Sequence, residues 1–276
     1  MKSFTEIESI AKSCLSGKRG ISYGLIFLNY VIAFAIGLIP FVGNIISFTV
    51  TGALSLGVCY FFLKILRSGE VEIDDLFVAF KSKDLFLSSL VAYLLSLAII
   101  IPTLLIFGLI WVALFLGDIE NLAQLISPSA YGDGTSAAPY TMDPSFLNPY
   151  SSPIFESGIV TIILSAIIFI LIPLTIISLI LSQVFFILAD KKTNSGQESI
   201  KISFNIMKGN IFKLFLLQLY VFRYPILTLF VCLLLVLPNV ELMTTSFVLF
   251  GIFIQFFFYM PTYFTSLAKF YQELND

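Results

Sequence analysis

The sequence predicts an all-α fold, a polytopic membrane bundle of six transmembrane helices with amphipathic helices at the cytoplasmic interface. Composition is the first reason, because 58% of the 276 residues are hydrophobic and only 12% are charged, whereas soluble domains are about a quarter charged. The mean hydropathy is +1.00. Six apolar stretches also reach the roughly 20 residues that a helix needs to cross a bilayer. The third reason is the uneven distribution of Lys and Arg, which divides the chain into two sides.

The six predicted spans lie at Ile21–Val42, Ile45–Ile65, Leu85–Leu116, Ile159–Leu188, Ile211–Leu237 and Phe247–Leu267. We expect residues 1–276 to form a single membrane domain. Its parts are a cytoplasmic amphipathic helix (1–20), spans one to three (21–116), an external loop (117–158) and spans four to six (159–276). Spans three and four run to about 30 residues, so we expect them to tilt or to kink at Pro102 and Pro173.

Positive charge orients these spans. Fourteen of the fifteen Lys and Arg residues fall in segments 2–19, 64–83, 191–213 and 269, and none lies between Gly117 and Gly158. Because Lys and Arg are retained on the cytoplasmic side, we expect these four segments and both termini to be cytoplasmic. The loop without positive charge is expected outside, where it forms an irregular cap with a short helix around Asn121 to Ile126. The predicted location is the cell membrane.

An amphipathic segment precedes each odd-numbered span. The segment from Ser3 begins with a capping box that Glu6 completes, and apolar residues follow at helical spacing up to Gly17. Similar segments run over 73–80 and from a box-like Ser195 to Gly209. We therefore expect three antiparallel hairpins, each entered through an interfacial helix. The similar text around Gly17 and Gly209 suggests a threefold parallel repeat. Alternatively, glycine ends both helices for backbone reasons alone.

The residue inventory excludes several chemistries. The chain has no histidine, so it offers no His ligands for zinc and no Ser-His-Asp triad. It has no glycine-rich phosphate motif, and no Asp or Glu lies deep in a predicted span to relay protons. We expect no enzyme activity, no metal site and no cofactor. No basic tract indicates nucleic-acid binding, so the expected partners are membrane lipids and a membrane protein.

Arg223 is the one charged residue deep within a predicted span. In a regular helix it lies near the bilayer midplane, where a charge costs at least about 2.5 kcal/mol, so it requires polar partners. The candidate ligand-binding set is Arg223, Gln218, Tyr224, Gln255 and Tyr259, which suits an anion or a lipid headgroup. The alternative is that span five begins later and Arg223 snorkels to the cytoplasmic interface.

Several segments form a recognisable pattern across most of the chain: Ala11 to Gly17, Asp75 to Phe80, Ile187 to Asp190, Ser203 to Leu219, and Phe270-Tyr271. This pattern resembles a family of bacterial integral-membrane proteins, the domain of unknown function 975. The predicted external loop is longer than is usual there, and Arg223 stands where small or aromatic residues are expected. The resemblance implies a helical multi-pass protein and no established activity.

Two functional interpretations follow. The first is a non-enzymatic accessory or scaffold protein of the cell envelope, because the chain lacks a catalytic set, a proton relay and a nucleotide site. The alternative is a transporter or lipid-handling permease with a site near Arg223. A solvent-connected cavity around Arg223 favours the permease, and a solidly packed bundle favours the scaffold.

Overall fold

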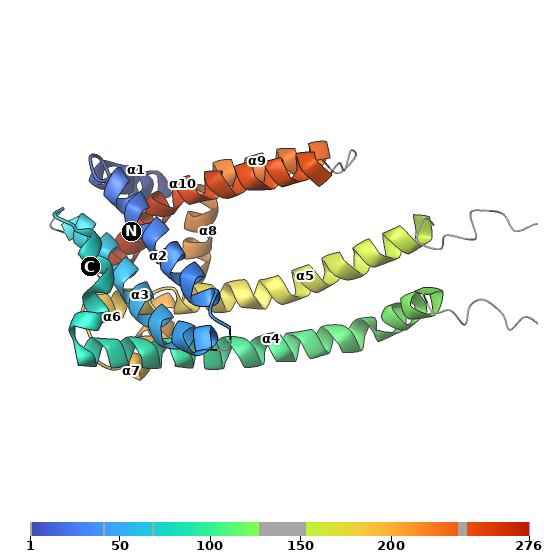
Figure 1. Ribbon diagram of the computed structural model, residues 1–276, viewed down its shortest axis with the longest axis horizontal. Helices are drawn as coiled ribbons and strands as arrows, with labels where there is room; N and C mark the ends of the chain where they lie inside the picture. Colours follow the sequence, from blue (N-terminus) through green and yellow to red (C-terminus); the bar gives the residue numbers. More distant parts are fainter. Residues whose placement is uncertain (1, 41, 68, 127–152, 237–241, 276) are drawn as a thin grey trace, which may run out of the picture. The chain divides into compact units, whose positions relative to one another are not determined.

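A computed structural model describes the backbone of residues 2–40, 42–67, 69–126, 153–236 and 242–275 (Figure 1). Within these ranges, the side chains of 44, 118–126, 153–160, 163, 231–236, 242–250 and 252–253 are not described. The described residues contain helices and no strand, which confirms the all-α prediction. The chain divides into two compact units: Met1–Leu97 together with Ser178–Asp276, and Ala98–Ile177.

The helices follow the predicted order of amphipathic segments and hairpins. The first group is α1 (Phe4–Cys14), α2 (Arg19–Gly37) and α3 (Val42–Arg67). The second is the 3-10 helix η1 (Ile73–Lys81), α4 (Lys83–Ile126), α5 (Pro153–Leu181) and the short α6 (Val184–Ala189). The third is α7 (Gly196–Met207), α8 (Ile211–Val221), α9 (Arg223–Val236) and α10 (Leu242–Asn275).

Among the described residues, four helices are long and apolar enough to cross a membrane: Arg19–Gly37, Ile45–Arg67, Lys83–Gly117 and Leu164–Ala189. They match the first four predicted spans. The fifth predicted span is not one straight helix, because α8 and α9 meet at a bend of 65°. The sixth predicted span lies within α10, and part of it has no described side chains. Six crossings therefore stay a prediction.

The helices around the predicted external loop are longer than expected. Helix α4 continues to Ile126, in agreement with the short helix predicted there, and α5 begins at Pro153. At the first edge the predicted short helix is continuous with α4, because residues 118–126 contain neither Gly nor Pro to stop it. At the second edge the expectation of an irregular loop is wrong, because α5 is already helical from Pro153. Residues 127–152 lie outside the described part of the chain.

The prolines do not interrupt the long helices. Pro102 and Pro173 lie inside α4 and α5, whose helical backbone continues through both. Span four is interrupted instead at Ser182 and Gln183, just before α6 begins. The capping box predicted at Ser3 is present. The one read at Ser195 is wrong, because Glu198 accepts a hydrogen bond from the Thr193 hydroxyl and Ser195 makes no side-chain cap.

Each amphipathic helix packs against the returning helix of the preceding hairpin. Helix η1 contacts α3, α7 contacts α6, and α1 contacts α10. Because α10 ends the last hairpin, its contact with α1 closes this order into a ring. At the turns after α1 and α7, Gly17 and Gly209 have φ of +75° and +83°, values that favour glycine. This cyclic order is the one that a threefold parallel repeat generates.

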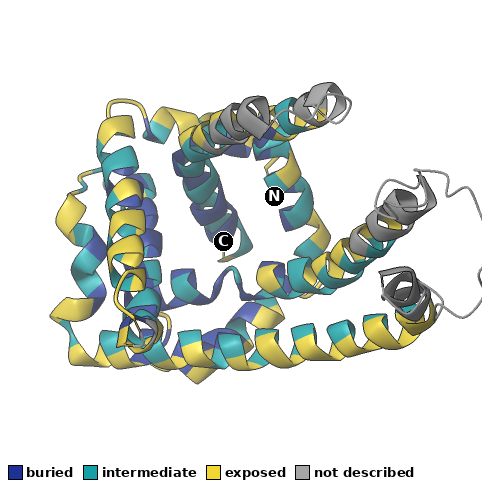
Figure 2. Ribbon diagram, turned by 45° about the vertical axis from the view of Figure 1, so that its right-hand side comes forward, coloured by how far each residue is buried: buried dark blue, intermediate teal, exposed yellow. Residues whose placement is uncertain are grey.

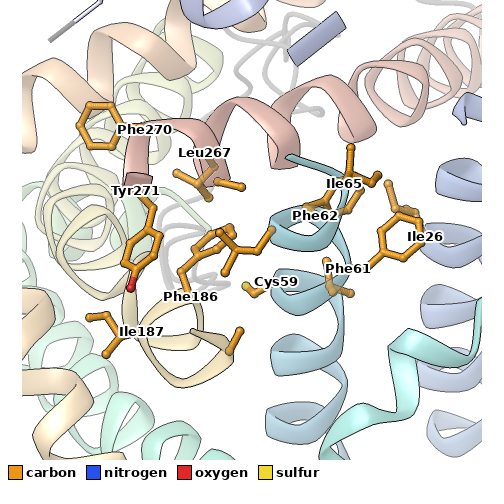
Figure 3. Packing of buried hydrophobic residues seen from close by; sticks show 14 of the residues in the cluster. Ile26, Cys59, Phe61, Phe62, Ile65, Phe186, Ile187, Leu267, Phe270 and Tyr271 are labelled. Atoms are coloured by element: carbon orange, nitrogen blue, oxygen red, sulfur yellow. The ribbon is translucent and has the colours of Figure 1, made fainter. Parts of the chain in front are cut away.

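The hydrophobic core lies where the returning helices end (Figure 3). Phe62 of α3 stacks on Phe264 of α10 with ring centroids 5.3 Å apart, and Phe186 of α6 stacks on Tyr271 of α10 at 5.8 Å. The Tyr271 hydroxyl donates a hydrogen bond to Asp190 (3.0 Å). The other Asp190 oxygen pairs with Arg67 of α3 (2.7 Å). Asp190 thus ties α3 to α10 just beyond the end of α6.

The amphipathic helices bury part of their apolar faces inside the protein. The buried residues are Ile7, Ala11 and Leu15 on the α1 segment, Leu76 and Ala79 on η1, and Ile200 and Met207 on α7. In Figure 2 the buried residues gather in this part of the molecule, whereas α4 beyond Leu97 shows only intermediate and exposed residues among those described.

The second unit is a pair of apolar helix segments from α4 and α5. The Trp111 indole nitrogen donates a hydrogen bond to Ser165 Oγ (3.1 Å), and the rings of Phe107 and Phe169 lie 5.9 Å apart. Large apolar side chains face outward, including Leu109 (69% exposed) and Ile168 (58%). Such a pair suits a lipid environment, in which apolar side chains need no burial.

We predict that Gly57→Ala destabilises the protein by about 1–3 kcal/mol, the usual cost of overpacking a core. A Cβ at Gly57 would lie 1.9 Å from the Leu76 carbonyl oxygen, so η1 would have to move away from α3. Gly108→Ala is the matched control, because a Cβ there meets nothing within 4 Å. Thermal unfolding in detergent measures both variants, and equal midpoints would contradict the prediction.

Candidate functional site

The site around Arg223 begins with the break between α8 and α9. Helix α8 ends at Val221, and α9 begins at Arg223 after a bend of 65°. Pro225 falls in the first turn of α9, where its missing N–H leaves no intrahelical hydrogen bond unmade. In a continuous helix that N–H would bond to the Val221 carbonyl. The proline therefore accounts for the restart of the helix, and it places Arg223 at the corner.

The partner of Arg223 comes from the opposite end of the chain. Arg223 Nη1 donates hydrogen bonds to Glu8 Oε2 of α1 (2.9 Å) and to the Tyr220 carbonyl (2.6 Å). The other Glu8 oxygen, Oε1, pairs with Lys12 Nζ at 2.8 Å. Glu8 is 4% exposed, so its carboxylate is held between two cations inside the protein. This pairing docks α1 onto the corner of the bent helix pair.

Aromatic rings cover the guanidinium. Its carbon lies 4.2 Å from the ring centroid of Tyr220 and 4.7 Å from that of Tyr224, distances at which a cation is attracted to a ring face. The Phe4 ring lies 6.4 Å from Tyr220, and Tyr259 lies 6.5 Å from Tyr224. The Arg223 side chain is 32% exposed, so the corner is partly open to its surroundings.

The electrostatics of Glu8 reflect two opposing effects. Burial of the carboxylate by itself raises its pKa, but the hydrogen bonds from Lys12 and Arg223 outweigh burial and hold the pKa of Glu8 below its ordinary value. Glu8 is therefore ionised at neutral pH. Its single negative charge is shared between Lys12 and Arg223, so Arg223 already has a carboxylate partner within the protein.

The structure brings together only part of the predicted site. Tyr224 contacts Arg223, and Tyr259 lies behind Tyr224. The amides of Gln218 and Gln255 bond elsewhere: Gln218 donates to the Tyr263 hydroxyl (3.0 Å) and Gln255 to the Thr228 hydroxyl (3.1 Å). In the described part of the chain the hydrogen bonds of both amides go to other side chains, and their place in a site around Arg223 stays a prediction.

Three residues of this site were not predicted from the sequence: Glu8, Lys12 and Tyr220. Phe4, Ile7, Ala11 and Leu15 mark the apolar face of α1, and Glu8 falls on that same face, four residues after Phe4. A carboxylate at such a position signals a buried charge that needs a cation. Arg223 is distant in sequence, so periodicity alone did not identify it as this cation.

A narrow gap lies near the corner, between α8 and α10. The gap is too narrow to admit a water molecule. Gln218, Tyr263 and Ser266 are its polar lining residues; leucines and Val221 complete it. The Ser266 hydroxyl is buried and has no hydrogen-bond partner among the described residues. In this conformation the gap is too small for a substrate.

The comparisons with known proteins identify one family. A family model described as "Protein of unknown function (DUF975)" matches residues 1–276. No curated protein and no solved structure matches the chain.

We predict that Glu8→Gln and Arg223→Gln each destabilise the protein by about 1–3 kcal/mol. Glu8→Gln leaves Arg223 without its carboxylate, and Arg223→Gln leaves the buried Glu8 carboxylate with Lys12 as its remaining cation. The double variant should lose less than the sum of the two, with a coupling of about 1 kcal/mol. Thermal unfolding of all four proteins in one detergent measures this coupling. Strict additivity would contradict the ion pair.

Acid should weaken this contact. Because the pKa of Glu8 is depressed in the folded protein, its contribution to stability is present above the ordinary carboxyl pKa of about 4.3 and is lost as the pH falls through the folded value. We predict that the difference in unfolding midpoint between the wild type and Glu8→Gln is constant from pH 7 to 5 and shrinks below about pH 4. A constant difference at pH 3 would contradict it.

Proposed function

Because the chain belongs to the DUF975 family of proteins of unknown function, we propose its role from its own structure. It is a non-enzymatic, multi-pass protein of the bacterial cell membrane that acts as a scaffold or accessory protein for other envelope components. The observation that carries this proposal is that Glu8, a residue of the protein itself, forms an ion pair with Arg223. The carboxylate of Glu8 therefore already occupies the position beside Arg223 that was predicted from the sequence to hold an anionic ligand.

The packing near Arg223 supports the same proposal. The neighbouring gap is too narrow for water, and the amides of Gln218 and Gln255 are engaged with other side chains. A permease in an open or occluded state requires a cavity large enough for its substrate, usually about 300 Å³ or more. A packed bundle is what a scaffold requires, because its partners bind on the outside.

The two ends of the chain support an even number of crossings. The Lys2 backbone N–H donates a hydrogen bond to Glu273 (3.4 Å), and the Lys2 ammonium lies 3.7 Å from the same carboxylate. Figure 1 shows both termini in the same region. Chain ends that touch lie on one side of the membrane. If α9 crosses the membrane, α10 must return, which makes six spans with both termini on one side; the distribution of Lys and Arg makes that side the cytoplasm in this proposal.

A lipid-handling permease is the second candidate, and two helix breaks favour it. Interrupted helices commonly line transporter sites, and here the breaks lie at Ser182–Gln183 and at Phe222. Gln183 is fully buried and its amide oxygen has no partner among the described residues. A permease would use these polar groups in a second conformation, in which α1 leaves Arg223 and the gap beside Ser266 widens.

The two functions make different predictions for native mass spectrometry of the protein purified in a mild detergent. For a scaffold, we expect a stoichiometric protein partner, and we expect the bound lipids to be unchanged in a folded Arg223→Leu variant. The control is an unrelated multi-pass protein purified from the same membranes, which must not carry that partner. A defined lipid or solute that is lost in Arg223→Leu, without any protein partner, would establish the permease instead.

A further inference from the structure

We propose that the exposed face of α7 and the first turn of α8 form a binding surface for the headgroups of anionic phospholipids. This surface consists of Lys201, Phe204, Lys208, Phe212 and Lys213. The inference rests on the membrane location proposed above and adds a lipid class and a place on the protein.

Helix α7 has two distinct faces. Ser199, Ile200, Ser203 and Met207 are buried, and Ser203 donates a hydrogen bond to the Ile180 carbonyl near the end of α5 (2.5 Å). The opposite face carries Lys201, Phe204 and Lys208 at spacings of three and four residues, and all three are exposed. The buried face fixes α7 on the protein and turns the cationic face outward.

The lysines of this surface lack carboxylate partners. Lys201 and Lys208 make no ion pair within the described part of the chain, and Lys213 donates only to the Asn210 amide oxygen (3.3 Å). Glu198, the acidic residue of α7, is engaged by the Thr193 hydroxyl. By contrast, two other exposed lysines have such partners: Lys2 pairs with Glu273, and Lys81 pairs with Asp74. The surface therefore has positive charge available for an external anion.

Two exposed phenylalanines indicate which anion it is. Phe204 is 41% exposed and Phe212 is 68% exposed, and each stands within four residues of the lysines. Rings beside ammonium groups fit the membrane interface, where apolar side chains enter the acyl region and lysines contact phosphates. A soluble phosphate has no apolar part to contact the exposed rings, and an acidic segment of a soluble protein does not require them.

The bend at Phe222 is compatible with a position of this surface at the membrane interface. If α9 runs along the membrane normal, the 65° bend lays α8 closer to the membrane plane than to the normal. The side chains of Phe212 and Leu219, which is 41% exposed, are seven residues apart and so share one face of α8. The corresponding turn after Gly17 also presents cations, because Lys18 and Arg19 make no ion pair with the described residues.

The test compares two double variants, Lys208→Gln/Lys213→Gln and the control Lys2→Gln/Lys81→Gln, each delipidated in a neutral detergent. Phosphatidylglycerol or phosphatidylcholine is titrated in, and native mass spectrometry counts the bound lipids. Each lysine near an anionic lipid surface contributes about a factor of five in affinity. We expect about 30-fold weaker phosphatidylglycerol binding in Lys208→Gln/Lys213→Gln, unchanged phosphatidylcholine binding, and less than a threefold change in the control.

Further arms separate the ways in which the proposal would fail. Lys208→Arg/Lys213→Arg should bind as the wild type does, which excludes misfolding as the cause of a loss. Equal phosphatidylglycerol affinity in the wild type and Lys208→Gln/Lys213→Gln would overturn the surface. So would displacement of the lipid by millimolar inorganic phosphate, since it would indicate a site for the free anion. Release of the protein from membranes by alkaline carbonate would instead overturn the proposed membrane location.

Discussion

The hydrophobic effect acts only where water is present, and the rest of the structure depends on this constraint. The buried core gathers where α3, α6 and α10 end and where α1, η1 and α7 cover them. Where the chain runs as long apolar helices, at 98–117 and 164–177, no described residue is buried. In lipid, apolar side chains gain little from contact with one another. The fold is consequently held together by a core of buried apolar side chains of the kind that stabilises a soluble protein.

The ion pair between Glu8 and Arg223 belongs to this core. Both charges lose part of their hydration, and such a pair compensates for that cost only when the geometry is good and further hydrogen bonds complete it. Lys12, the Tyr220 carbonyl and two aromatic rings supply that completion. The pair therefore specifies which helix docks at the corner more than it adds to stability. To bind Arg223, an anionic ligand would have to displace the Glu8 carboxylate, and α1 would then have to move away from the corner.

Helices with strong periodicity were the predictable part of the fold. The apolar spacing from Phe4, and again from Ile73, identified α1 and η1, and the glycines at 17 and 209 marked the ends of the segments that precede α2 and α8. The breaks were less predictable. Pro102 and Pro173 were the expected kink sites, and the helical backbone of α4 and α5 continues through both. Span four breaks instead at Ser182 and Gln183. Neighbouring helices decide whether a proline bends a helix, and a local pattern does not contain them.

By itself, the sequence determined the all-α class, the apolar segments and the need of Arg223 for a partner, because composition, helical period and the cost of a buried charge are local properties. Only the tertiary structure decided that the partner is Glu8, that α8 turns away from α9, and that Gln218 and Gln255 bond elsewhere. It also decided that α1 closes the ring of hairpins on α10. The hydrogen bonds among these outcomes join residues from 27 to 215 positions apart, and no periodicity along the chain records such contacts.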